Sequence, residues 1–144
     1  LINDVLVRLR EPTVSTNLET TYSTLLGKFV NDAKRQIEDA FAWNVLVQTI
    51  TVTTVANTSS YSLTGAGQKF QVLDAINTTS LLGMTNVDFV TMNRNINFLP
   101  VGTSAPVNYA FNGVDGSYDT KVTLYPVPDA VYTVKFSLAV PQAT

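Results

Sequence analysis

The oxygen-bearing side chains of Asp115, Ser117 and Asp119 are spaced two residues apart, as ligands are in a calcium-binding loop. Such a loop also needs flanking helices and a closing glutamate, and this stretch offers neither, so we interpret it as a solvated hairpin loop. Gly65-Ala66-Gly67 is a GxG, but a strand pattern follows it at 70–75. A dinucleotide or phosphate site requires a helix there, so this motif predicts a hairpin turn.

Glu38 and Asp39 are the carboxylates that an acid–base enzyme could pair. Both fall on the polar side of a predicted helix, four residues after Lys34 and Arg35, and this spacing predicts ion pairs on a helix surface. Glycoside hydrolysis needs two facing carboxyl groups. Residues 47–144 contain no Glu, and most of their Asp residues fall in predicted turns. No catalytic arrangement emerges.

The composition excludes further chemistry. The 144 residues include no His and no Cys, so nucleophile pairs with histidine and the usual zinc, haem or iron–sulfur ligand sets are excluded. We therefore predict that the protein is not an enzyme and holds no cofactor or metal. The net charge of −2 argues against nucleic-acid binding through clustered Lys and Arg. No apolar run approaches the roughly 18 residues of a membrane span.

The sequence divides into two parts near Val47, where charge density falls and hydrophobic periodicity changes from helical to alternating. Residues 1–46 carry 5 basic and 6 acidic groups, whereas 47–144 carry 4 and 5. The first part predicts a short helix over residues 1–10, stopped at Glu11-Pro12. A second helix should begin at a capping box formed by Thr16 and Glu19 and run to about Leu46, roughly 29 residues with an apolar arc about 160° wide. Residues 1–10 are too few to cover that arc.

The second part alternates apolar and polar residues. Strand patterns cover 47–55, 60–63, 70–75, 107–112, 121–124 and 132–140, 79–85 is a further candidate, and a short helix capped by Asn86 is expected over 86–94. The aromatic side chains of the last strands, Tyr109, Phe111, Tyr132 and Phe136, are expected in the core, as is Trp43 between helix and sheet. We predict an α+β fold with a helical module (1–46) and an antiparallel β-rich module (47–144), a sandwich or a meander. The start at Leu1 and the abrupt end favour truncation at one or both ends.

One stretch carries a resemblance to a known family. Thr13-Val14-Ser15-Thr16 leads into the apolar and polar positions of 22–46, with Asn31, Ala33 and Trp43 at characteristic spacing, and the 124–128 and 132–136 segments follow. Over most of 13–140 the sequence resembles the head-to-tail adaptor (connector) proteins of short-tailed phages, the tail tubular protein A type. It departs from that family after Val140, where the returning helices of the family are missing.

The resemblance implies a structural virion protein at the head–tail junction. It also implies that copies of the chain form a ring, a dodecamer, that contacts the portal protein and the tail nozzle or tube. In this ring dsDNA would pass without sequence readout. For the interface between subunits we expect the polar side of the long helix, with Lys28, Lys34, Arg35, Glu38 and Asp39. The alternative is a viral β-sandwich that binds a receptor or glycan and uses the helix as a stalk, but a wide apolar arc is not typical of a coiled-coil seam.

Overall fold

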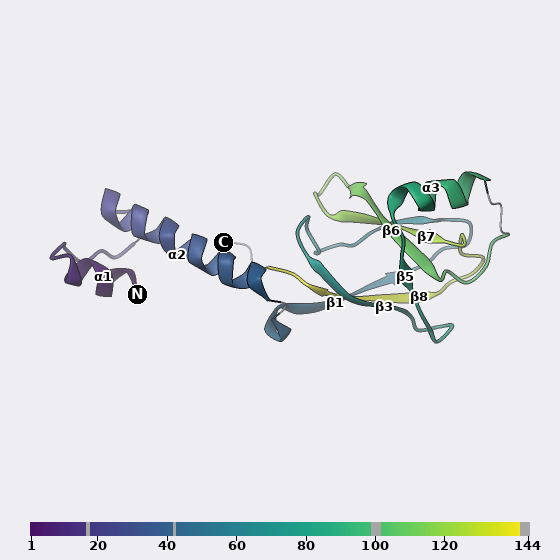
Figure 1. Ribbon diagram of the computed structural model, residues 1–144, viewed down its shortest axis with the longest axis horizontal. Helices are drawn as coiled ribbons and strands as arrows, with labels where there is room; N and C mark the ends of the chain where they lie inside the picture. The colour runs from purple at the N-terminus through teal and green to yellow at the C-terminus, as the bar shows by residue number, and fades with distance from the viewer. Residues whose placement is uncertain (17, 42, 99–101, 142–144) are drawn as a thin grey trace. The chain divides into compact units, whose positions relative to one another are not determined.

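A computed structural model describes residues 1–16, 18–41, 43–98 and 102–141 (Figure 1). The described residues form two compact units, one ending at Phe41 and the other spanning Trp43–Pro141. The first unit is helical and the second is built on two sheets, so the predicted α+β class with a β-rich part is confirmed.

The helical unit contains α1 (Ile2–Arg8) and α2 (Thr21–Ala40). The short first helix is confirmed: it ends at Arg8, with Leu9 as its C-cap, and Arg10 beyond it has a positive φ of 60°. The predicted length of the second helix, roughly 29 residues, is wrong. α2 has 20 residues and is about 30 Å long at 1.5 Å per residue. It stops where Phe41 becomes extended, and Asn44–Leu46 forms a separate 3-10 turn, η1, ahead of the first strand.

The start of α2 also differs from the prediction. Thr20, rather than Thr16, is the N-cap: its hydroxyl oxygen accepts a hydrogen bond from the backbone N–H of Ser23 at 3.0 Å, and the Ser23 hydroxyl oxygen accepts one from the N–H of Thr20 at 3.0 Å. Glu19 instead accepts from the N–H of Ser15. The reciprocal Thr20–Ser23 pair satisfies two orphan donors of the first turn, which places the boundary four residues later than predicted.

The second unit is a sandwich of two four-stranded sheets (Figure 1). One sheet, here sheet A, has the order β1-β8-β3-β4, and the other, sheet B, has the order β2-β7-β6-β5. All neighbouring strands are antiparallel except β5 and β6. The strands are β1 (Val47–Thr53), β2 (Ser60–Ser62), β3 (Gln71–Asn77), β4 (Leu82–Gly83), β5 (Thr85–Asn86), β6 (Asn108–Val114), β7 (Thr120–Tyr125) and β8 (Thr133–Ala139).

Alternating apolar residues of both sheets meet in one core. The predicted core aromatics are confirmed for Phe136 of β8, which is fully buried, and Tyr109 of β6, which is 4% exposed, with ring centroids 5.3 Å apart in an edge-on arrangement. Phe111 packs against them, but the prediction is wrong for Tyr132, which lies outside this core and donates its hydroxyl to Asp129 at 2.6 Å. Around Phe136 and Tyr109 pack Val52, Leu63, Ala66, Ala75, Val122, Leu124, Val134 and Leu138. Desolvation inside the core raises the pKa of the Tyr109 hydroxyl, with a smaller contribution from the Asp74 carboxylate.

The outer face of sheet B is covered by α3 (Phe89–Phe98), whose Met92 packs on Ala110 and Tyr125. The predicted short helix is therefore present, but Asp88 rather than Asn86 caps it, accepting from the N–H of Thr91 at 2.9 Å. Hydrogen bonds from the Thr91 side chain and from its backbone N–H lower the pKa of the Asp88 carboxyl.

The last three strands do not form a meander. β6 and β7 pair as a hairpin, but β8 crosses to the other sheet and lies between β1 and β3. Pro126 and Pro128 lie in the connection between β7 and β8 and lack the N–H that a continued ladder needs, so β7 ends at Tyr125. The 79–85 candidate contains two short strands, β4 and the start of β5, rather than one.

Candidate assembly surface

The two motifs that first suggested chemistry contact each other in a structural role. One side-chain oxygen of Asp119 accepts hydrogen bonds from the backbone N–H groups of Gly65 (3.0 Å) and Gly67 (3.1 Å). The Gly65-Ala66-Gly67 turn is thereby tied to the β6–β7 loop. It joins β2 of sheet B to β3 of sheet A, so it is a turn, as predicted, but not a hairpin.

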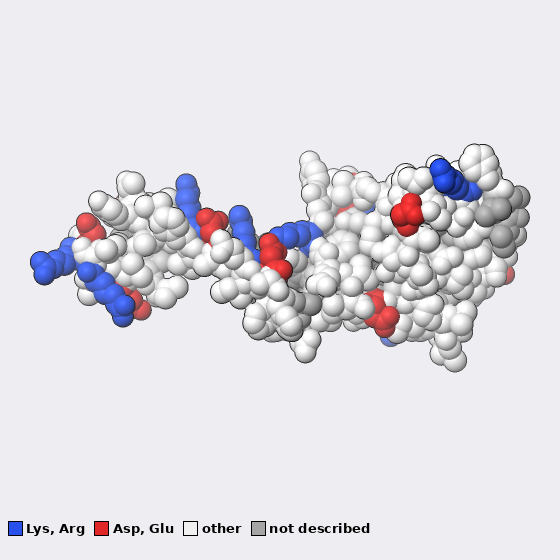
Figure 2. All heavy atoms as spheres, in the orientation of Figure 1, with Lys and Arg blue, Asp and Glu red and all other residues white. Residues whose placement is uncertain are grey.

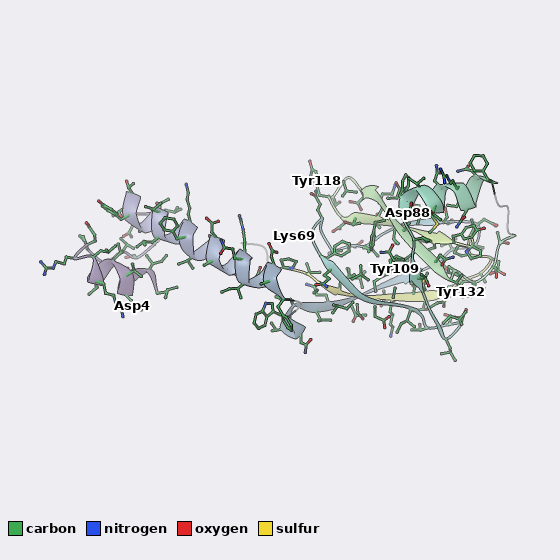
Figure 3. All side chains as sticks on the ribbon, viewed as in Figure 1. Asp4, Lys69, Asp88, Tyr109, Tyr118 and Tyr132 are labelled. Carbon is green, nitrogen blue, oxygen red and sulfur yellow. The ribbon has the colours of Figure 1, made fainter. Side chains whose placement is uncertain are left out.

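Asp115 is held in the same loop. One of its carboxylate oxygens accepts from the N–H groups of Ser117 (2.8 Å) and Asp119 (3.0 Å), which makes the predicted hairpin loop. Hydrogen bonds, first from the Ser62 side chain and then from these backbone groups, lower the pKa of the Asp115 carboxyl. No three His, Cys, Asp or Glu side chains within the described ranges are grouped so as to hold a metal ion. Tyr118 stands at the tip of this loop, 69% exposed (Figure 3).

In the helical unit, α1 covers only one side of α2. Leu6 of α1 is 1% exposed, and the buried residues of α2 are Ser23 and Gly27. Both are small, four residues apart and therefore on one side of the helix, so the two helices can approach closely there. The buried residues of α2 thus lie in its first two turns.

A second row of apolar side chains on α2 is left open to solvent. We call it the α2 stripe, and its members follow one another at spacings of three or four residues, so they share one helix face. It consists of Tyr22, Leu25, Phe29, Ala33, Ile37 and Phe41. Its large residues are 45–64% exposed, with Phe29 at 60% and Phe41, the C-cap, at 64%. A contiguous apolar surface of this kind marks an interaction site in a soluble domain.

The predicted interface residues all lie on α2, in two rows. Lys28, Arg35 and Asp39 follow each other at spacings of seven and four residues, so they form one row. Lys34 and Glu38 form the other, joined by an ion pair of 3.7 Å between Nζ and Oε1. Basic and acidic side chains alternate along the helix (Figure 2).

The charges of α2 oppose its helix dipole. Its last turn carries Glu38 and Asp39 and no basic residue, and its first turn carries no acidic residue. Acidic groups near a helix C-terminus are unfavourable by roughly 0.3–1 kcal/mol each at an exposed surface.

Trp43 corrects a prediction, because at 40% exposed it is not part of the core. Which apolar positions on α2 are covered could not be predicted either, because periodicity shows that a face is apolar but not what packs on it.

Among the described residues, no helix is both long enough and apolar enough to cross a membrane.

Comparison with known proteins gives one match. A family model described as "SU10 adaptor protein" matches residues 1–143 of the chain. No curated protein and no solved structure matches it.

Proposed function

The chain belongs to the SU10 adaptor protein family, a family of phage head–tail adaptors, and from this we propose that copies of it form a closed ring at the head–tail junction. As a member, it is a structural protein of the virion rather than a member of an enzyme family. In the proposal, the ring joins the capsid portal to the tail nozzle or tube. Cyclic contacts between two different surfaces of each subunit close such a ring, here of about twelve copies.

The exposed α2 stripe is the observation that carries the ring. Tyr22, Phe29 and Phe41 each leave more than half of their surface uncovered within the chain. Aromatic side chains are enriched at the buried centres of protein interfaces, whereas a protein that stays monomeric seldom exposes several in one row. A neighbouring copy is the partner that a ring supplies to every subunit, and in the proposal it covers this stripe.

The charged rows beside the stripe give the contact its register. Lys28, Lys34 and Arg35 are balanced by Asp32, Glu38 and Asp39, so this side of α2 has no net charge. A surface of alternating sign is complementary to another protein surface of alternating sign, including one from a second copy, and charge complementarity fixes register more than it adds affinity. The acidic last turn is then positioned to meet basic groups of the neighbour.

DNA passes through the lumen of the proposed ring without being read. The whole chain has a net charge of −2, and retention of duplex DNA depends on clustered Lys and Arg that neutralise phosphates. A lumen without such clusters lets the duplex slide.

Native mass spectrometry of the purified chain, together with a cryo-electron microscopy map of virions that contain it, tests the proposal. We expect a closed ring of about twelve copies seated on the portal, with α2 at the contact between neighbours. A stable monomer that binds glycans would overturn it in favour of a receptor-binding module. A ring whose subunit contacts leave α2 in solvent would keep the function and refute the interface.

A further inference from the structure

Sheet A ends in an open strand edge at β1. Neighbouring backbone hydrogen bonds show which residues of β1 face β8: the N–H of Thr54 donates to the carbonyl of Tyr132 at 2.9 Å, and the carbonyl of Leu46 accepts from the N–H of Val140 at 3.0 Å. Alternate residues of a strand bond to the same side. Even-numbered residues of β1 therefore bond to β8, and odd-numbered residues direct their N–H and C=O groups to the free edge.

The free edge has a defined length. At its far end the Tyr61 hydroxyl accepts from the N–H of Val55 (3.0 Å) and donates to the carbonyl of Thr58 (2.6 Å), so the N–H of Val55 is satisfied within the chain. The preceding outward-facing residues are Val47, Thr49, Thr51 and Thr53. The backbone N–H of Val47 donates to the carbonyl of Asn44 in η1. The backbone groups of Thr49, Thr51 and Thr53 have no hydrogen-bond partner among the residues that the structure describes. All four side chains are exposed on the outer face of sheet A.

This edge lacks the protection that natural sheets give to exposed strands. Proline, charged side chains and bulges are the usual devices, because unpaired edges recruit further strands. The strand Val47–Thr53 contains no charge, no Pro and no Gly, and its seven residues pair with β8 in unbroken register. It is also rich in Val, Ile and Thr, the residues best suited to a pleated ladder.

We propose that the β1 edge binds an extended segment of a different virion protein, which adds to sheet A as a fifth strand. Main-chain hydrogen bonds to Thr49, Thr51 and Thr53 supply the affinity, as in other cases of strand addition. The bound segment is uncharged and places apolar, β-branched residues beside Ile50 and Val52, so that the sandwich core continues into it, while its alternate side chains lie beside the threonines.

A second copy of this chain does not match the edge, a point that rests on the proposed ring. The other sheet edges offer no unbroken seven-residue run. β2 has three residues and β4 and β5 have two each, and the parts of β3 and β6 that extend past β4 and β5 contain register shifts, at 72–74 and 111–114. Pairing of β1 with β1 of another copy is isologous and needs a two-fold axis, which neighbours in a cyclic ring do not share.

Residue-resolved hydrogen exchange on the isolated chain and on intact virions tests this inference. In the isolated chain, the amides of Thr49, Thr51 and Thr53 should exchange rapidly, whereas those of Gln48, Ile50 and Val52 should be protected by β8. In virions the odd-numbered amides should become protected as well, by at least about tenfold, because each would gain a main-chain hydrogen bond. Odd-numbered amides that exchange equally fast in both states would overturn the proposal, and so would their protection in an isolated dimer.

Thr51→Pro provides an independent arm. Proline removes the outward N–H of residue 51 and none of the bonds between β1 and β8, and edge positions of this kind tolerate it. With Thr51→Ala as the matched control, we expect Thr51→Pro to fold and to form rings like the wild type but to be incorporated into virions at least about tenfold less well. Equal incorporation of both variants would overturn the inference. If the wild-type chain formed no rings, the proposed function would be refuted instead, so the two failures are distinguishable. If Thr51→Pro does not fold, the hydrogen-exchange experiment decides.

Discussion

Truncating Phe29 at the centre of the α2 stripe should separate assembly from folding. Phe29 is 60% exposed, and a phenylalanine side chain offers roughly 200 Å², so roughly 120 Å² remains for a neighbouring subunit to bury. At about 25 cal/mol per Å² this is about 3 kcal/mol per contact, or a loss of affinity of about a hundredfold on substitution by Ala. The roughly 80 Å² already covered within the chain limits the fall in the free energy of unfolding to about 2 kcal/mol.

Sedimentation velocity over a range of concentrations measures the change in assembly, and urea unfolding measures the change in stability. Phe98→Ala is the matched control, because Phe98 is 77% exposed on α3, outside the stripe. We expect Phe29→Ala to shift ring formation to much higher concentration and Phe98→Ala to leave it unchanged. If both variants assemble like the wild type, or if the control weakens assembly as strongly, the stripe is not the subunit contact.

Three further predictions concern the fold. Thr20→Ala removes the N-cap of α2 and should cost about 0.5–2 kcal/mol, measured as lost helical circular dichroism and a lower urea midpoint. Asp119→Ala removes the acceptor shared by the N–H groups of Gly65 and Gly67 and should cost about 1–3 kcal/mol in urea unfolding, with Asp119→Asn less costly because its amide oxygen still accepts. The lowered pKa of Asp115 stabilises the fold at pH values above the ordinary carboxyl pKa, so this contribution should disappear as the pH falls through the folded-state pKa; Asp115→Asn should flatten that part of a stability–pH curve, and an unchanged curve would contradict it.

Local structure followed from the sequence where one short-range pattern decides it. The alternation of Tyr109 and Phe111 with polar neighbours predicted β6 and its buried face, because a strand repeats every two residues. Glu11-Pro12 correctly predicted that the first helix ends before it, although the helix stops two residues earlier than expected, at Arg8. The capping box was misplaced because the one at Thr20 is closed by Ser23, which does not match the usual Glu or Gln at this position, whereas Thr16 and Glu19 do match it.

Strand partners were beyond local patterns. β8 has the same alternation that a meander strand would have, yet it pairs across the sandwich with β1, whose residues lie far away in the sequence. Trp43 was expected in the core on the strength of its size, but hydrophobicity does not show whether a partner surface is present. For the same reason periodicity identified an apolar side of α2 without showing that α1 covers so little of it, and it did not indicate an open edge at β1.

The position of β8 has a consequence for biosynthesis. β1 and β3 do not pair with each other; each is held by β8, which is the last strand in chain order, so Val47 gains its cross-strand neighbour only when Ala139 has been made. During translation, sheet A therefore stays incomplete until nearly the whole β-rich unit has left the ribosome, and long-range pairing of this kind is slow to form. Chains interrupted before Ala139 would lack both the sandwich core and the ordered β1 edge, so they could not enter a growing particle through that edge.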